Sequence, residues 1–488
     1  MKKIAIYFLF IFGLQGCAVK NNPHDLLSRL VKRSEVGAEN MPNIIAAVHS
    51  PYFNAAFKKP TFPNNVITVK PGGESIQKAI DSLEKMGGGT VKLAPGHFLS
   101  GRITLKSNIE LQVQKDAILE FKSEIEDFLP VVFTRNEGIE LYSLGACIYA
   151  ENATNIAITG KGKIYGPGQG TIRERTMTHD VIENIVDHKI PVDQRIYDGK
   201  TADFIFPPAL IAPIHCKGVY IEGVSLAQSA FWNIVPTYCE DVIIRGISIN
   251  SIGIQRGDGI DVESSRNVLI EYCSFETGDD CIALKAGRGY DGLRVNKPTE
   301  NIVIRNCYAK QGHGGMTIGS ETAGMVQGVY VHNCVFDGVD VGLRFKTRRP
   351  RGGGGKNILF ENIYLNTVHS ALRWDMLGQA LHVGNQADRN FKVEKNPLTP
   401  RFSDIEMRNI YIENAADCIR IEGIPESKLE NVKISSVNGK GKRFLVARDA
   451  KSITIQHSVF AVEDAEIDTI NVQDLNLKGI EFNRTLNF

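Results

Sequence analysis

A short segment with a single pattern recurs ten times along this chain and restricts the folds that it can adopt. Each copy starts with glycine or a small polar residue and continues with mostly apolar, often β-branched residues, as in Asn267-Val-Leu-Ile-Glu and Asn301-Ile-Val-Ile-Arg. Such residues favour strands, whereas glycine, asparagine and aspartate favour corners. The copies begin at Asn155, Gly218, Asp241, Asn267, Asn301, Gly328, Asn357, Asp404, Asn431 and Ser452.

The intervals between these copies indicate stacked coils. Most are 21 to 34 residues long, and units of this size bury an apolar face only by stacking. No helical period separates the copies, which excludes a doubly wound α/β sheet and predicts an all-β, single-domain parallel β-helix. The sixth residue after each start should stack inside this helix, and it is apolar or cysteine: Val224, Ile247, Cys273, Cys307, Cys334, Ile363, Ile410 and Val437.

The domain boundaries follow from the same pattern. We expect the β-helix domain to span residues 61–488, preceded by a tether and irregular segment over residues 18–60. Within residues 74–86, Ile76, Ala79, Ile80 and Leu83 share one helical face, which predicts an N-terminal capping helix. Insertions between the repeats are predicted at residues 171–205, at residues 286–300 and within residues 375–403.

The N-terminus predicts export. Residues 1–17 combine a basic start, the apolar run Ile4–Leu14 and Cys17, an arrangement that resembles a bacterial lipoprotein signal peptide. The apolar run is shorter than the ~20 residues that span a bilayer. We therefore expect acylation of Cys17 and a protein that is lipid-anchored in the bacterial cell envelope, in the periplasm or at the outer-membrane surface. An ordinary signal peptide with an incidental cysteine is the alternative.

Composition argues against several classes of partner and cofactor. Lys and Arg exceed Asp and Glu by 56 − 55 = 1, which leaves no basic excess for a nucleic acid. The eight cysteines after Cys17 contain no CxxC pair and are predicted to be buried thiols. We find no GxxxxGK[ST] motif and expect no GxGxxG segment that opens a helix after a strand, so no cofactor is expected. A monomer that contacts the membrane only through its lipid is predicted.

Four polar clusters interrupt the central repeats: Arg256-Gly-Asp258-Gly-Ile-Asp261, Gly278-Asp279-Asp280-Cys281, Gly312-His313-Gly314-Gly315 and Arg344-Phe-Lys346. Asp279 and His313 each stand 12 residues after the start of their repeat, so they should lie on neighbouring coils about 4.8 Å apart. Hydrolysis of a glycosidic bond needs a protonated acid and a carboxylate that activates water. Adjacent acids raise each other's pKa, and cations suit an anionic sugar.

In order and spacing, these clusters resemble the four signatures of polygalacturonases, glycoside hydrolase family 28. The resemblance implies a right-handed, pectin lyase-like β-helix that hydrolyses galacturonic acid linkages in pectin with inversion and without a metal. It implies that Asp279 is the general acid and that Asp258 and Asp280 hold the attacking water. By the same resemblance, His313 keeps Asp279 protonated, and Arg344 and Lys346 bind the galacturonate carboxylate.

One departure from the family pattern affects substrate preference. The family usually has Asn-Thr before the first aspartate, whereas this chain has Arg256-Gly257. We expect Arg256 to contact the substrate. Rhamnogalacturonan hydrolases also lack the Asn-Thr pair, so hydrolysis of rhamnogalacturonan or another branched pectin is an alternative. The insertions at 171–205 and 286–300 favour release from chain ends, because they could block one end of the binding face.

Other interpretations stay open at this stage. The chain could be a non-catalytic glycan-binding β-helix, or a lyase whose aspartates bind Ca²⁺. We interpret Asp261 as a turn-capping corner residue and Trp374 as a packed residue. Lys285 and Arg288 are interpreted as groups at the rim of the site. A solvated loop is the preferred interpretation for the arginines that follow Lys346, with extra subsites for a polyanion as the alternative: Arg348, Arg349 and Arg351.

Overall fold

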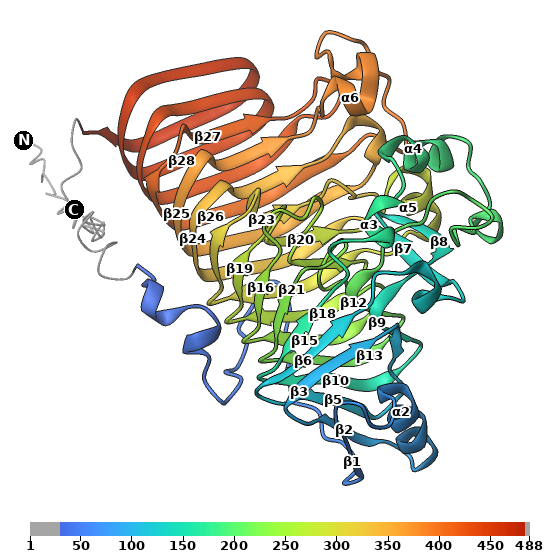
Figure 1. Ribbon diagram of the computed structural model, residues 1–488. Helices are drawn as coiled ribbons and strands as arrows, with labels where there is room; N and C mark the ends of the chain where they lie inside the picture. Colours follow the sequence, from blue (N-terminus) through green and yellow to red (C-terminus); the bar gives the residue numbers. More distant parts are fainter. Residues whose placement is uncertain (1–29, 484–488) are drawn as a thin grey trace, which may run out of the picture.

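The computed structural model describes residues 30–483, and these form the predicted parallel β-helix (Figure 1). Successive coils add strands to three parallel stacks, which we number in chain order within a coil. The first stack contains β1 (Val66–Val69), β2 (Gly89–Leu93), β5 (Ile109–Val113), β10 (Thr154–Gly160), β13 (Lys217–Glu222), β15 (Glu240–Arg245), β18 (Arg266–Glu271) and β21 (Thr299–Arg305).

The second stack contains β3 (Gly96–Ser100), β6 (Ala117–Phe121), β11 (Lys163–Tyr165), β14 (Ser225–Ala227), β16 (Ser248–Asn250), β19 (Ser274–Glu276) and β22 (Tyr308–Gln311). The third contains β4 (Ile103–Thr104), β9 (Ala146–Glu151), β12 (Ala209–Ile214), β17 (Ile260–Glu263), β20 (Ile282–Lys285), β23 (Gly314–Ile318) and β27 (Asp417–Glu422). Four long strands bend through more than one stack: β24 (Val326–Lys346), β25 (Gly354–Asp375), β26 (Arg401–Asn414) and β28 (Leu429–Phe482).

The residue that starts each repeat has a definite backbone role. All ten starting residues adopt positive φ, between 54° and 70°, where glycine, asparagine and aspartate are tolerated best. Several of the asparagines also form a ladder between coils, in which Asn301 Nδ2 donates to Asn267 Oδ1 (3.2 Å) and Asn267 Nδ2 donates to Asp241 Oδ1 (3.2 Å). The repeat pattern thus reflects corners in which the chain turns into the first stack.

The column of core residues is confirmed. Each of the eight residues predicted to stack inward is buried, including Cys273, Cys307 and Cys334. All eight cysteines in the described part of the chain are free and buried, as expected for thiols that pack as small apolar groups. Trp374 is also fully buried and stacks on Phe345 with ring centroids 4.9 Å apart, so its interpretation as a packed residue is correct.

The predicted capping helix is present, and an irregular segment precedes it. Helix α2 (Ile76–Lys85) begins at Ser75, whose side chain accepts a hydrogen bond from the Lys78 amide, and it buries its four predicted apolar residues. Before it, two short 3₁₀ helices, η1 (Arg33–Glu35) and η2 (Ala38–Asn40), lead into an irregular segment. That segment packs Ile45, Phe53 and Phe57 against the outside of the first stack.

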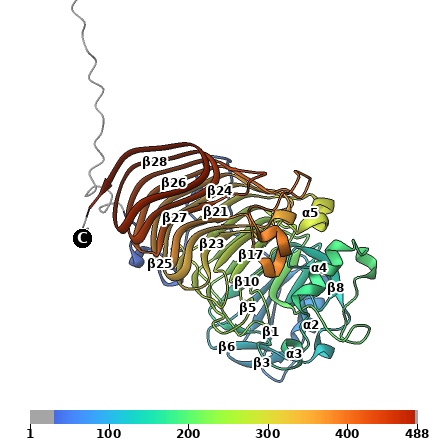
Figure 2. The same cartoon turned by 90° about the horizontal axis from the view of Figure 1, so that it is seen from above.

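The insertions gather on one side of the stack (Figures 1 and 2). A hairpin of β7 (Val132–Asn136) and β8 (Ile139–Ser143) shares an apolar cluster with helix α4 (His179–Asp187). The cluster includes Ile139, Leu141, Ile182, Ile185 and Val186. The remaining short elements of this side are α3 (Thr171–Glu174), α5 (Gly289–Val295), α6 (Ala380–Val383), η3 (Ile125–Phe128), η4 (Val192–Gln194), η5 (Arg349–Arg351) and η6 (Gly384–Ala387).

One expectation about the insertions is wrong. Residues 287–292 read Gly-Arg-Gly-Tyr-Asp-Gly, a GxGxxG segment that follows strand β20 and opens helix α5. The glycines here serve packing within the protein. A Cβ at Gly287 would lie 1.9 Å from the Arg135 guanidinium, and a Cβ at Gly292 would lie 2.6 Å from the Ala323 Cβ.

Candidate active site

The predicted catalytic residues lie at the turns that lead from the second stack to the third. Asp258 stands between β16 and β17, Asp279 and Asp280 between β19 and β20, and His313 between β22 and β23. One oxygen from each of the three carboxylates lies within 4.8 Å of the others. The shared phase of these residues in the repeat therefore brings together groups from three coils.

Asp279 and His313 are direct neighbours. Their side chains approach to 3.2 Å between His313 Nδ1 and Asp279 Oδ1, and the His313 amide donates to the Asp279 carbonyl (2.9 Å). Burial raises the pKa of Asp279, but the contact with His313 and the charge of Lys346 outweigh it, so the pKa is lowered. The same contact raises the pKa of His313.

Asp280 is held by the two predicted substrate-binding cations. Its carboxylate accepts from Lys346 Nζ (2.7 Å) and from Arg344 Nη1 (3.2 Å). Burial raises the pKa of Asp280, but the charges of Lys346 and Arg344 lower it far below its usual range. The Asp280 side chain is fully buried, whereas those of Arg344 and Lys346 are 27% and 23% exposed, so the two cations present charge to solvent above a buried carboxylate.

A second buried cluster lies beneath Asp258. Lys285 Nζ lies 3.7 Å from Asp258, 3.2 Å from Asp261 and 3.5 Å from Glu321, and it stands 4.4 Å from the ring centre of Trp232. Burial and neighbouring carboxylates raise the pKa of Asp258 well above its usual range. Asp258 is therefore the carboxyl of the three that most readily keeps a proton in the free protein.

Two interpretations from the sequence are wrong here. Asp261 is not a corner residue but a fully buried member of β17, paired with Lys285. Lys285 and Arg288 are not rim groups, because only 3% and 1% of their surfaces are exposed. Strand alternation does not reveal this, because it does not show which groups pack over a strand. Glu321 and Trp232 lie beside Lys285, and Glu137 and Glu183 pair with Arg288.

Comparison with known proteins agrees with this geometry. The model of glycosyl hydrolases family 28 matches residues 90–443. The chain belongs to this family. A probable polygalacturonase from Vitis vinifera is 29% identical over 375 residues, which cover 75% of this chain and 70% of the relative. An exo-poly-alpha-D-galacturonosidase from Dickeya chrysanthemi is 26% identical and is covered over 59% of its length.

Among solved structures, the crystal structure of a hyperthermoactive exopolygalacturonase from Thermotoga maritima is similar over 88% of this chain and 94% of that one. The two share 29% sequence identity with a TM-score of 0.71. A family 28 exopolygalacturonase from Yersinia enterocolitica, at 21% identity and a TM-score of 0.66, shares the fold. This family 28 chain is thus a glycoside hydrolase with a right-handed parallel β-helix.

In this family 28 hydrolase, the β7–β8 turn and α4 form ion pairs with segments at both ends of the third-stack strands. Glu137, in the β7–β8 turn, pairs with Arg288 (2.8 Å) after β20 and with Arg256 (3.2 Å) before β17. Glu183 of α4 pairs with Arg288 (3.2 Å) and Arg351 (3.3 Å). We call these five residues the crossing cluster, because they connect the segment before β17 with the segments that follow β20 and β24.

The interpretation of the arginines after Lys346 as a solvated loop is also wrong. Arg349 and Arg351 are buried, at 3% and 2% exposure, and do not belong to a solvated loop. Arg349 pairs with Glu426 (2.7 Å), and Arg348 lies 4.0 Å from Glu183. Sequence reasoning did not single out Glu137 or Glu183, because they approach Arg288 only after two insertions fold together. The predicted substrate contact Arg256 is 24% exposed and carries the Glu137 pair.

The three carboxylates of this family 28 hydrolase could also be considered as cation ligands. Asp258, Asp279 and Asp280 offer oxygens close enough to share one ion. However, Ca²⁺ takes 6–8 oxygen ligands, and three ammonium or guanidinium groups already lie within 4 Å of Asp258 or Asp280: Lys285, Arg344 and Lys346. The donor set therefore fits a hydrolytic site better than a calcium site.

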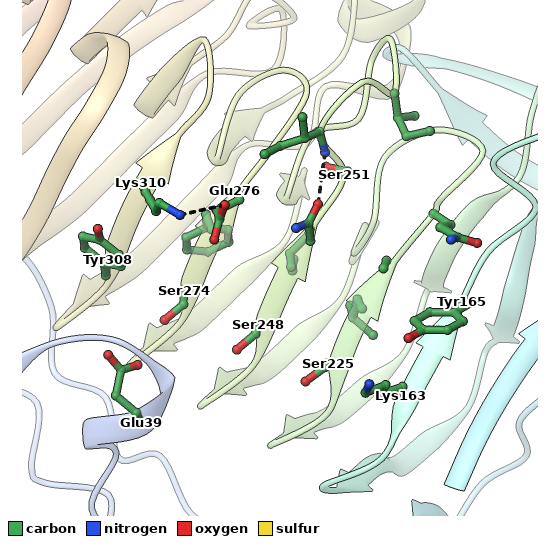
Figure 3. Close-up of a pocket in the computed structure, with 18 of the residues that line it drawn as sticks. Glu39, Lys163, Tyr165, Ser225, Ser248, Ser251, Ser274, Glu276, Tyr308 and Lys310 are labelled. Carbon is green, nitrogen blue, oxygen red and sulfur yellow. Dashed lines mark hydrogen bonds and ion pairs between the residues drawn. The ribbon is translucent and has the colours of Figure 1, made fainter. Parts of the chain in front are cut away.

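A separate groove lies on the second stack (Figure 3). It has a volume of about 870 Å³ and carries a row of serines from adjacent coils, Ser225, Ser248 and Ser274. Ser251 and Ile254, from the loop that leads to Asp258, form part of its wall. The groove thus borders the loop that leads to Asp258 and is not lined by Asp258, Asp279 or Asp280.

Proposed function

We propose that this family 28 hydrolase cleaves polygalacturonate by acid-assisted attack of water, with inversion at the anomeric carbon. The difference in burial among the three carboxyls carries this proposal. The Asp279 side chain is 26% exposed, whereas those of Asp258 and Asp280 are 4% and 0% exposed. Asp279 can therefore reach a glycosidic oxygen, while the other two can act on the sugar only through a water.

This burial opposes a covalent mechanism. In a retaining glycosidase, the nucleophilic carboxylate must itself contact the anomeric carbon. The carboxylate oxygens here are closer together than the ~6.5–9.5 Å usual for inverting enzymes, and that spacing taken alone would favour retention. We give more weight to burial, because neither Asp258 nor Asp280 can reach a sugar carbon directly.

The proposed substrate is anionic. Arg344 and Lys346 expose part of their charge beside Asp279, and a guanidinium binds a carboxylate through two hydrogen bonds. Several relatives bear polygalacturonase names, which agrees with a galacturonate unit at this position. Rhamnogalacturonan remains the second candidate, because Arg256-Gly257 replaces the Asn-Thr pair common in polygalacturonases.

We further propose that the enzyme removes sugars from chain ends. The crossing cluster bridges the third stack beside Asp258, and a polysaccharide lying along the stack could not continue past it. The Thermotoga maritima relative is an exopolygalacturonase, whereas a Pectobacterium parmentieri relative, 26% identical, is named an endo-polygalacturonase. The crossing cluster, more than the names, supports the end-directed mode.

Products should be resolved by size over time from polygalacturonate and from rhamnogalacturonan, with and without a chelator. The proposal predicts early release of monogalacturonate from polygalacturonate, insensitivity to chelator and inversion of the anomeric proton signal in ¹H NMR. Asp279→Asn should lower kcat by about 10³-fold or more with an unchanged melting temperature. A product with a retained anomer would refute the water-mediated step, and an early ladder of oligomers would refute the end-directed mode.

Two further proposals concern the cell. We propose that Cys17 is acylated and anchors a monomeric enzyme in the cell envelope; Cys17 lies outside the described residues. Among the residues that the structure does describe, no helix is long and apolar enough to cross a bilayer. Metabolic labelling with a radioactive or clickable fatty acid should mark the wild type and not Cys17→Ser.

A further inference from the structure

A row of side chains extends from the catalytic site along the outer face of the third stack. The strand register places Asp261, Ala283, Thr317, Arg344, Arg373 and Arg420 opposite one another on successive coils. Arg344 belongs to the proposed carboxylate clamp. The next two members of the row are again arginines, so positive charge continues along the face towards the C-terminal coils.

The two arginines beyond Arg344, Arg373 and Arg420, differ in how many hydrogen bonds their guanidinium groups make to neighbouring carboxylates. Arg420 is held by Glu422 through two hydrogen bonds (2.8 and 3.0 Å) and lies 3.5 Å from Asp417. Arg373 makes a single 3.4 Å contact, from Nη2 to Asp375 Oδ2. Its other N–H groups have no partner within residues 30–483, and its side chain is 32% exposed.

The neighbour of Arg373 is itself fixed in place. The other oxygen of Asp375 accepts the backbone amides of Leu377 and Gly378, both at 3.2 Å. Asp375 therefore orients Arg373 through one oxygen while most of the guanidinium fork stays free. A fork with free N–H pairs is suited to a carboxylate, which it can bind in a bidentate manner.

The spacing of the coils is comparable with the length of one sugar unit of the proposed substrate. Adjacent strands lie about 4.8 Å apart, similar to the length of one pyranose unit in an extended chain. A galacturonan that places one carboxylate at Arg344 and Lys346 would place the next near the following coil. We propose that Arg373 binds the carboxylate of the galacturonate unit that follows the clamped unit, on the open side of the site.

This inference rests on the proposed function, because it assigns a second sugar position to the same site. The crossing cluster is proposed to block the substrate on the side of Asp258. A disaccharide therefore fills the one sugar position on that side and the position at Arg344 and Lys346. A trisaccharide adds the unit at Arg373. Arg373 thus becomes a specificity-determining residue that acts only when the substrate is long enough to reach it.

The test compares galacturonate oligomers of two to five units with Arg373→Ala, Arg373→Lys and the control Arg420→Ala. The loss in kcat/KM caused by Arg373→Ala should step up between two and three units, by about 10- to 100-fold, as expected for lost charge-assisted hydrogen bonds. Arg373→Lys should recover part of the loss. Arg420→Ala, which removes an arginine from the same row, should show no step at that length.

A binding measurement distinguishes failure of the Arg373 assignment from failure of the proposed function. In the Asp279→Asn background, calorimetry should show weaker binding of trigalacturonate when Arg373→Ala is added. An equal loss at every oligomer length, or no loss, would overturn the assignment of Arg373 while leaving the proposed function standing. Absence of hydrolysis of any galacturonate by the wild type would overturn both.

Discussion

Glu183 offers the sharpest test of whether the crossing cluster enforces action at chain ends. Burial raises the pKa of this carboxyl, but the contact with His179 and the charges of Arg288 and Arg351 lower it from 4.5 to about 2. At 1.36 kcal/mol per pKa unit, that difference corresponds to about 3 kcal/mol. The side chain is 31% exposed, so solvent screening reduces the expected contribution to about 2 kcal/mol.

Glu183→Gln should therefore weaken the crossing cluster by about 2 kcal/mol. The population of molecules in which the cluster is broken should rise about 30-fold. Adding Glu137→Gln removes a second of the three carboxylates that reach Arg288, leaving Glu321, and should enlarge the effect. The assay is the ratio of oligomers to monogalacturonate in the first few per cent of reaction, together with the free energy of unfolding in urea. In the variant, oligomers should appear early.

The pH dependence of the crossing cluster has a definite sign. Because the folded-state pKa of Glu183 is lowered, its stabilisation is present above about pH 4.5 and is lost as the pH falls towards 2. A matched control is Glu361→Gln, which breaks a 2.8 Å pair with Arg408 at a side chain 25% exposed on the first stack. If Glu183→Gln loses stability yet still releases only monogalacturonate, the crossing cluster does not set the mode of action.

Three further perturbations follow from the site and the core. Lys346→Gln removes the shorter of the two contacts to Asp280 and should raise KM for galacturonate oligomers about tenfold or more, measured in steady-state kinetics. Burial and nearby carboxylates raise the pKa of Asp261 from 3.8 to about 8. Between these two pH values the folded protein binds a proton that the unfolded chain releases, so the free energy of unfolding should fall as the pH rises from 4 to 8. Asp261→Asn should reduce this pH dependence, measured by urea titrations at pH 5 and 8. Trp374→Ala should cost about 3–5 kcal/mol in the same assay, because the indole is fully buried against Phe345, and a cost below 1 kcal/mol would contradict that packing.

The sequence predicts the fold well because one conformational requirement repeats. Each coil needs a residue at positive φ where the chain enters the first stack, and Asn155, Gly218 and Asp241 meet that need with residue types that are easy to recognise. The same phase places Asp279 beside His313. The sequence repeat therefore predicts contacts within one coil and contacts between equivalent positions of adjacent coils.

The features that the sequence does not reveal depend on the insertions. Lys285 and Arg288 are of residue types usually found at the surface. Both are buried here, and the β7–β8 turn and α4 supply ion-pair partners to Arg288. Asp261 lies two residues before Glu263 on a strand that is buried on both faces, so alternation gives no sign of which side is covered. The ion pairs of buried Arg288 with Glu137 and Glu183 join segments more than 100 residues apart.

The protonation of Asp279 connects the clamp to catalysis. In the free protein its pKa is lowered, partly by His313 and Lys346, which is unfavourable for the proton donor that we propose it to be. A galacturonate carboxylate bound at Arg344 and Lys346 adds a negative charge and engages the cation that stabilises ionised Asp279. Substrate binding should therefore raise the pKa of Asp279, so that the acid becomes protonated mainly when an anionic sugar is in place. A neutral, methyl-esterified unit at the clamp would supply no such charge, and discrimination against it would then arise in kcat as well as in KM.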